Sequence, residues 1–137
     1  MGEVRREFKF LDVKPFSPNL GAEVYGVDLS APLTESQFNE IRAAFLDYQV
    51  LFFKGQSEIS PGQHIEFGKR FGKLHVHPAA PTMMGQPEIF EIHATKDSKV
   101  ANGEFWHSDV SCDEEPPLGT ILQIHITPKC GGDTMFS

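Results

Sequence analysis

Apolar and polar positions alternate along two short segments near the N-terminus, residues 8–12 and 24–29. Alternation with a period of two is typical of strands that bury one face. Between the two segments, Pro15–Gly21 is rich in residues that form turns. The pattern therefore predicts a pair of strands, separated by a turn, at the start of the chain.

The period then changes to that of a helix. Thr34 is a suitable N-cap, and Gln37 three residues later completes a capping box. The apolar positions that follow have helical spacing: Phe38, Ile41, Phe45 and Tyr48. Val50–Phe53 is an uninterrupted apolar run that predicts a buried strand, and Lys54 and Gly55 end it.

A second helix is predicted by the same kinds of signal. Ser60 is expected as its N-cap, Pro61 as its first residue and Gly72 as its C-terminal stop. The face expected to turn toward the core carries His64, Phe67 and Phe71. We therefore expect His64 to be a packed helix residue rather than a metal ligand.

From Leu74 onward the pattern predicts short strands separated by turns and loops. The expected strands are residues 74–77, 89–93, 105–111, 119–126 and 134–136. Two helices followed by many short strands indicate a mainly β chain with flanking helices, of the α+β class. A β-sandwich or jelly roll with helices packed on one side is the expected architecture. The length of 137 residues allows one domain at most.

Composition narrows the classes of partner. The formal net charge is −7, from 19 acidic and 12 basic residues, which argues against nucleic acid as a partner. No apolar run is long enough to span a membrane, and no secretion signal opens the chain, so we expect a cytoplasmic protein. Cys112 and Cys130 lack CxxC spacing and are expected to be reduced thiols, with a disulfide between them as the alternative.

The most informative chemistry lies in the triplet His107-Ser108-Asp109. On an extended strand, residues two apart share one face, so an imidazole and a carboxylate could bind the same cation. Such a pair supplies two of the three ligands of a 2-His-1-carboxylate iron site. Taken alone, the triplet is equally compatible with a hydrogen-bonded pair on a surface strand.

Blocks of sequence around this triplet strengthen the iron hypothesis. They are spread along the chain: Gly26-Val27-Asp28-Leu29, Gln49-Val50-Leu51-Phe52-Phe53, Arg70–Pro78, Phe105–Val110 and Gly131-Gly132-Asp133-Thr134. With these blocks, the chain resembles the TauD/TfdA family of Fe(II)/2-oxoglutarate-dependent dioxygenases. The resemblance covers nearly the whole chain, and the Trp-His-x-Asp and Gly-Gly-Asp-Thr blocks are its most specific parts.

The resemblance implies a double-stranded β-helix, or jelly roll, that is incomplete at the C-terminus. It also implies that residues 1–137 are the N-terminal part of one dioxygenase domain, cut before the distal His and Arg. His107 and Asp109 would bind Fe(II), Thr134 would bind the far carboxylate of 2-oxoglutarate, and O2 would take an open metal position. His77 would contact the anionic head group of the substrate.

Two positions depart from the pattern of the family's taurine-oxidising members. Ala80 stands where those enzymes carry a tyrosine, and Gly103 stands where they carry an asparagine. Losing a hydroxyl and an amide enlarges the pocket and removes polar partners of the substrate. A bulkier or less polar sulfonate, a sulfate ester or a carboxylate is therefore as plausible a substrate as taurine.

The expected function is hydroxylation of a small anionic substrate, with release of succinate and CO2. The sequence does not determine the oligomeric state, and a homo-oligomer is one of the open alternatives. These 137 residues alone are expected to be poorly stable and inactive. Two alternatives remain: a non-catalytic β-sandwich binding module, and a zinc hydrolase that uses His75, His77 and Asp109 around a metal-bound water.

Overall fold

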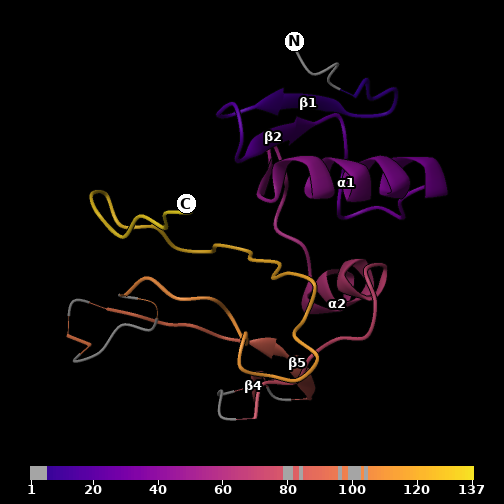
Figure 1. Ribbon diagram of the computed structural model, residues 1–137. Coiled ribbons are helices and arrows are strands. Elements are labelled where there is room, and N and C mark those ends of the chain that lie inside the picture. Colours follow the sequence, from indigo (N-terminus) through magenta and orange to yellow (C-terminus); the bar gives the residue numbers. More distant parts are fainter. Residues whose placement is uncertain (1–5, 79–81, 84, 96, 99–102, 104) are drawn as a thin grey trace. The chain divides into compact units, whose positions relative to one another are not determined.

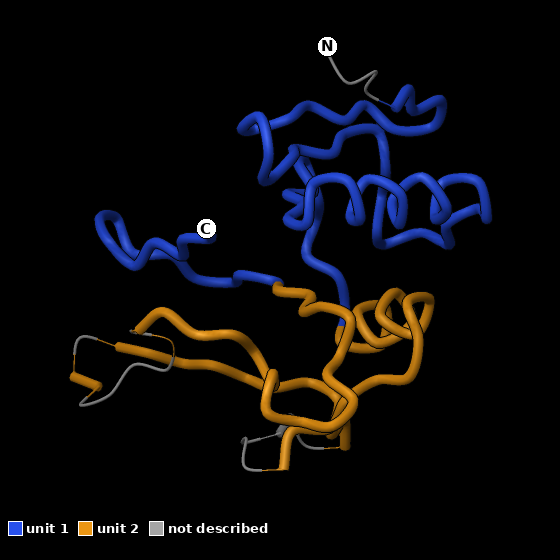
Figure 2. The backbone as a smooth tube through the Cα atoms, viewed as in Figure 1, with its two compact units in different colours: residues 1–60, 123–137 blue, residues 61–122 orange. Residues whose placement is uncertain are grey.

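The computed structural model describes residues 6–78, 82–83, 85–95, 97–98, 103 and 105–137 (Figure 1). The chain divides into two compact units (Figure 2). Unit 1 consists of residues 1–60 and 123–137, and unit 2 consists of residues 61–122.

Unit 1 is built on a small mixed sheet with the strand order β1-β2-β3. The strands are β1 (Asp12–Pro15), β2 (Ala22–Tyr25) and β3 (Leu51–Phe53). β1 and β2 are antiparallel, whereas β2 and β3 are parallel. Parallel neighbours need a crossover connection, and here α1 (Glu35–Tyr48) supplies it.

The start of α1 confirms the capping box predicted from sequence. The Thr34 hydroxyl accepts the backbone N–H of Gln37, while the Gln37 side-chain oxygen accepts the backbone N–H of Thr34. The helix runs beside the β1–β2 pair (Figure 1). Its buried residues are the expected ones with Ala44 in place of Phe45: Phe38, Ile41, Ala44 and Tyr48.

The core of unit 1 forms where this helix face meets the sheet. Ala44 and Tyr48 of α1 pack with Ala22 of β2, and Phe8 and Leu51 are among the partly buried residues against them. Apart from the phenol of Tyr48, the buried side chains among the described residues are hydrophobic.

Unit 2 contains α2 (Pro61–Lys69) and an antiparallel pair, β4 (Thr82–Met83) and β5 (Gln86–Phe90). α2 begins at Pro61, as the sequence predicts, and it contacts β5. Phe67 is buried and meets Phe71 edge-on, with 5.4 Å between the ring centroids. The mixed helix-and-strand class predicted from sequence is therefore confirmed.

Most of the strands predicted after Leu74 are wrong. Of the five, only 89–93 overlaps a strand, and β5 ends at Phe90. Residues 74–77, 105–111, 119–126 and 134–136 contain no strand. The reason is physical: alternation sets which face a side chain takes, but a strand also needs a neighbouring strand for its backbone hydrogen bonds. The two N-terminal strands exist, with bounds shifted by two to four residues.

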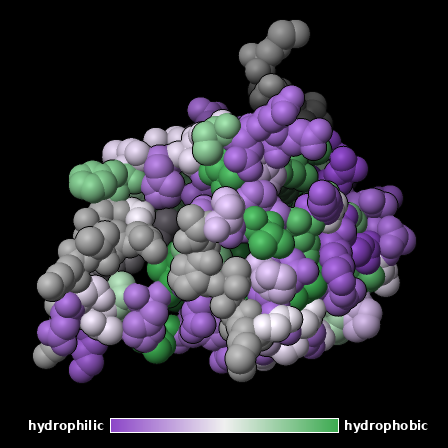
Figure 3. Space-filling model, turned by 90° about the horizontal axis from the view of Figure 1, so that it is seen from below, coloured by the Kyte–Doolittle hydropathy of each residue, from purple (hydrophilic) through white to green (hydrophobic). Residues whose placement is uncertain are grey.

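Several apolar side chains of the C-terminal region are exposed rather than packed. The side chain of Ile126 is 81% exposed. Five further apolar side chains are exposed to a smaller extent: Leu118, Leu122, Ile124, Met135 and Phe136. Figure 3 shows hydrophobic residues reaching the surface among hydrophilic ones. Across the part of the chain that the structure describes, no helix combines the length and apolar character needed to cross a membrane.

Candidate metal centre

His107 and Asp109 lie in unit 2, in an irregular segment that turns directly after the pair. The strand expected around them is absent, yet the two side chains still meet. Nε2 of His107 lies 3.3 Å from Oδ1 of Asp109. The turn covers residues 109–112 and includes Val110, whose φ of 50° is in the left-handed region. The pair therefore meets in irregular backbone and not on the pleat of a strand.

A second contact indicates that Nδ1 of the His107 ring carries a hydrogen. Nδ1 of His107 lies 2.6 Å from the backbone carbonyl oxygen of Phe105. Because a carbonyl oxygen only accepts, Nδ1 carries the hydrogen and donates it. In a neutral imidazole, Nε2 then presents a lone pair, which is the form that binds a metal.

Asp109 is held in a complementary way. The Thr120 hydroxyl donates to Oδ2 of Asp109 at 3.1 Å, so Oδ1 is the oxygen that faces His107. A lone pair and a carboxylate oxygen at 3.3 Å repel each other unless a positive charge lies at that place. Either a proton on Nε2 or a metal cation meets this need. The donor set, one imidazole and one carboxylate with second partners, fits two positions of an iron site.

The described part of the chain does not supply a third metal ligand next to this pair. Those residues contain no group of three His, Cys, Asp or Glu side chains that could hold a metal ion. The zinc site of His75, His77 and Asp109, considered as an alternative, is consequently not formed. The side chains of His107 and Asp109 are each 55% exposed, which leaves the pair open to further ligands.

His75 and His77 follow α2 in an irregular segment of unit 2. The His77 ring stacks on Phe90 of β5, with centroids 5.7 Å apart and planes 24° apart. His75 meets His77 edge-on, at 6.2 Å between centroids, and its Nε2 lies 3.2 Å from Oδ2 of Asp113. Phe90 therefore supports the His77 ring, and the Asp113 carboxylate holds the His75 ring.

The remaining predicted positions differ in how much the structure says of them. Thr134 is exposed in unit 1, just after Gly131 and Gly132, which both have a φ of 76° that favours glycine. Gly103 has a φ of 91°, and a Cβ there would lie 3.6 Å from Cε1 of His107. Ala80 lies outside the described residues.

Two partners of the site residues escaped the sequence reasoning. Thr120 and Asp113 are both ordinary polar residues in turn-rich sequence, and neither has a motif of its own. They matter because of contacts with residues far along the chain, which no local pattern encodes. Two further expectations are confirmed: both cysteines are free thiols, and His64 is a packed residue, with Nε2 3.2 Å from the Ile121 carbonyl oxygen.

Comparison with known proteins identifies enzymes that are similar to this chain. The chain is 33% identical over 127 residues to an alpha-ketoglutarate-dependent sulfate ester dioxygenase of Pseudomonas putida, a match covering 93% of this chain and 41% of that protein. It is 35% identical over 127 residues to an alkylsulfatase of Acinetobacter baylyi, covering 93% of this chain and 39% of that protein.

Among solved structures, a taurine dioxygenase from Burkholderia xenovorans is similar in fold, with a TM-score of 0.57 and 37% sequence identity. That match covers 64% of this chain and 31% of the solved one. The chain thus spans about two fifths of the length of the first two relatives. The family described as "Taurine catabolism dioxygenase TauD, TfdA family" matches residues 12–137, so the chain belongs to this family.

Proposed function

We propose that this chain is the N-terminal part of an Fe(II)/2-oxoglutarate-dependent dioxygenase that acts on a small organic sulfate ester or sulfonate. The observation that carries the proposal is the pairing of His107 and Asp109. Their facing atoms are 3.3 Å apart, and each side chain is oriented by a second hydrogen bond. Family membership supplies the reaction class for which such a pair is suited.

His107 and Asp109 would hold the metal through Nε2 and Oδ1. When bound, Fe(II) together with 2-oxoglutarate and O2 supplies the oxidising power for hydroxylation, with release of succinate and CO2. The backbone carbonyl of Phe105 keeps the proton on Nδ1 of His107, and Thr120 holds Oδ2 of Asp109, so that Oδ1 faces His107 and would be free to hold the metal. The chain's own contribution at this place is therefore orientation of two ligands.

Thr134 and His77 are proposed to bind the two organic molecules. The Thr134 hydroxyl would donate to the far carboxylate of 2-oxoglutarate, two residues after a glycine pair that permits a tight turn. His77 would offer an N–H to the anionic head group of the substrate. Its stacking on Phe90 supports this role, because a ring held by an aromatic face loses less freedom on binding.

The substrate class follows from the relatives and from one departure in sequence. The first two relatives are named for sulfate esters and alkyl sulfates. Gly103 leaves no side chain beside Cε1 of His107, so a longer or branched alkyl group has room there. Hydroxylation of the carbon that bears the sulfate or sulfonate gives an unstable product, which releases the inorganic anion and an aldehyde or ketone.

The fold of the whole protein is proposed to be a jelly roll that this chain contains in part. The chain spans about two fifths of its first two relatives, and apolar residues such as Ile124 and Ile126 are exposed here. Further strands pairing with residues 119–126 would bury them and satisfy their backbone groups. The distal His and the Arg that grips 2-oxoglutarate are proposed to come with those strands.

The test uses the protein expressed from its whole reading frame, with Fe(II), 2-oxoglutarate and O2. We expect sulfate or sulfite release from alkyl sulfates or alkyl sulfonates, in a one-to-one ratio with succinate. Turnover should disappear in His107→Ala but persist in His93→Ala, a change of an exposed histidine with no assigned role. Release of the anion without 2-oxoglutarate, or no turnover of any organic sulfate, sulfonate or carboxylate, would refute the proposal.

A further inference from the structure

Asp113 connects two segments that the proposed function uses separately. Its Oδ2 lies 3.2 Å from Nε2 of His75, a residue 38 positions earlier in the chain. His75 is two residues from His77, and Asp113 is four residues from Asp109. All of these residues belong to unit 2. The contact therefore ties the segment with the metal pair to the segment with the substrate histidine.

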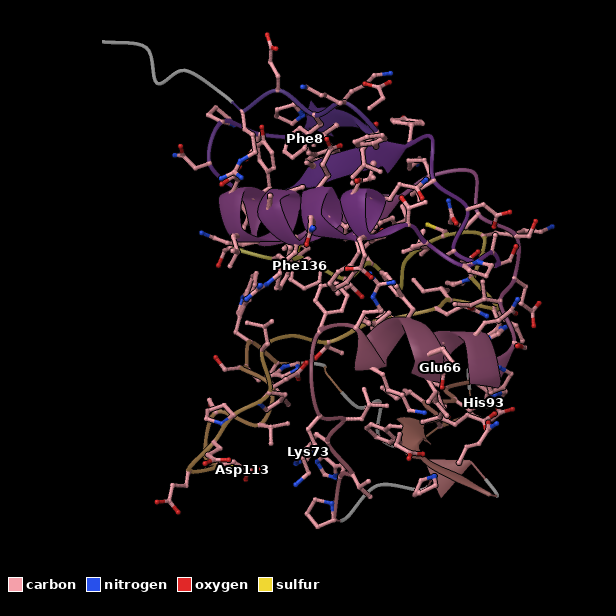
Figure 4. All side chains as sticks on the ribbon, turned by 90° about the vertical axis from the view of Figure 1, so that its right-hand side faces the viewer. Phe8, Glu66, Lys73, His93, Asp113 and Phe136 are labelled. Carbon is pink, nitrogen blue, oxygen red and sulfur yellow. The ribbon has the colours of Figure 1, made fainter. Side chains whose placement is uncertain are left out.

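The backbone from Val110 to Asp113 forms a turn that is closed by a hydrogen bond and directly follows Asp109. The N–H of Asp113 donates to the carbonyl oxygen of Val110 at 3.2 Å. Val110 has a φ of 50°, a region that β-branched residues rarely adopt and that persists only where surrounding contacts impose it. Figure 4 shows Asp113 on this segment, well apart from Glu66 of α2. Because the closed turn starts at the residue after Asp109, it fixes the backbone path that leads from Asp109 to Asp113.

On the other side of the contact, His75 is itself in touch with His77. Their rings meet edge-on with 6.2 Å between centroids, and the His77 ring stacks on Phe90. The His75 side chain is 29% exposed, so most of its surface is in contact with protein. A carboxylate that accepts the Nε2 hydrogen fixes the tautomer and the angle of the His75 ring.

We infer that Asp113 is a positioning residue for the proposed reaction: by holding His75, it sets the place of His77 relative to the metal pair of His107 and Asp109. The inference rests on the proposed function and names a residue for which the sequence pattern gives no signal. Asp113 touches neither the metal nor the substrate, so its effect passes through His75 and then His77.

The rival explanation is an ordinary surface ion pair. Asp113 is 44% exposed, and exposed pairs typically contribute about 0–1 kcal/mol to stability. Such a pair would alter neither substrate binding nor the position of His77. The two explanations therefore differ in the Michaelis constant of the substrate, which a surface pair leaves unchanged.

The experiment compares Asp113→Ala, Asp113→Asn and Glu114→Ala in the protein from the whole reading frame. For Asp113→Ala we expect the KM for the organic sulfate or sulfonate to rise about tenfold, by analogy with losing a residue that orients a ligand. The KM for 2-oxoglutarate and the affinity for Mn(II) should stay unchanged. Asn keeps an oxygen that accepts the Nε2 hydrogen, so it should restore most of the loss. Glu114 is the matched control, since it removes the same charge one residue away.

A double mutant tests the route of the effect. If Asp113 acts only through His75, then His75→Ala and Asp113→Ala together should raise the KM no more than either alone. The inference is overturned if Asp113→Ala leaves the KM at the wild-type value, or if Glu114→Ala raises it equally. Absence of turnover in the wild-type protein refutes the proposed function, and the role of Asp113 with it. An active wild-type enzyme that is insensitive to Asp113 refutes the inference alone.

Discussion

The Thr120 hydroxyl donates a hydrogen bond to Oδ2 of Asp109 at 3.1 Å, across 11 positions of sequence. This contact determines which carboxylate oxygen faces His107, because only one of the two is engaged by the hydroxyl. The orientation of Asp109, a proposed metal ligand, thus depends on a residue outside the His-x-Asp triplet.

Replacing Thr120 by Val removes the hydroxyl and keeps the shape of the side chain. We expect the affinity for Mn(II) or Fe(II) to fall about 10-fold to 100-fold, the usual cost of losing a partner that orients a ligand. Isothermal titration with Mn(II) under anaerobic conditions measures it. Thr127→Val, at an exposed threonine of unit 1, is the control and should bind the metal normally. Equal affinity in both variants would show that Thr120 does not orient the ligand.

His77 is predicted to bind the head group of the substrate. His77→Ala should raise the KM for the anionic substrate about tenfold or more, since a hydrogen bond to a charged group contributes roughly 1.5–3 kcal/mol. The KM for 2-oxoglutarate should not change. Steady-state kinetics with both substrates varied separates the two constants, and His93→Ala serves as the comparison. A parallel rise in both constants would argue for a general disturbance of the fold instead.

The side chain of Gln123 makes two hydrogen bonds with the backbone of Ile59. Its Oε1 accepts the Ile59 N–H at 3.3 Å, and its Nε2 donates to the Ile59 carbonyl at 3.1 Å. Ile59 is buried, so Gln123→Leu leaves two polar backbone groups with no partner there, and we expect a loss of about 2 kcal/mol in the free energy of unfolding. Gln123→Glu keeps the acceptor and should lose less. Urea unfolding measures the change. A Leu variant as stable as wild type would show that these two hydrogen bonds do not stabilise the fold.

Asp28 should titrate below its ordinary pKa. The Ser30 hydroxyl and the Ser30 N–H both donate to Oδ1 of Asp28, at 2.6 Å and 2.8 Å, and these bonds lower the pKa of Asp28, the hydroxyl most. Because the folded-state pKa is lowered, this carboxylate stabilises the fold above its unfolded-state pKa. The contribution disappears as the pH falls through the lowered value.

NMR titration of the Asp28 carboxyl carbon tests this directly. Ser30→Ala removes the larger cause and should shift the pKa of Asp28 back toward the ordinary value of 3.8. Ser57→Ala, at an exposed serine, should leave it in place. A titration curve that is the same in Ser30→Ala and wild type would contradict the assignment.

The parts of the fold with local signals were predictable from sequence. The capping box of Thr34 and Gln37 marks the start of α1 to the residue, and Pro61 marks the start of α2. Such signals need only neighbouring residues. The predicted strand at 119–126 failed because its backbone needs a partner strand, and the part of the chain that the structure describes supplies none.

The candidate site, like the fold, has parts that the sequence predicts and parts that it does not. The His-x-Asp triplet was recognisable, but its geometry was predicted from a strand, whereas the two side chains meet in irregular backbone next to a turn. The supporting contacts of Thr120 and Asp113 join positions 11 and 38 residues apart. Contacts of that kind depend on the folded path of the chain, so no motif announces them.

The most direct test of the account is metal binding by the protein from the whole reading frame. Mn(II) replaces Fe(II) without oxidation, and electron paramagnetic resonance reports the free ion during a titration. We predict one tight site in wild type and in His93→Ala, and binding at least 100-fold weaker in His107→Ala and in Asp109→Ala, since each loses one of a few ligands. Equally tight binding in all four proteins would show that this pair is not the metal centre.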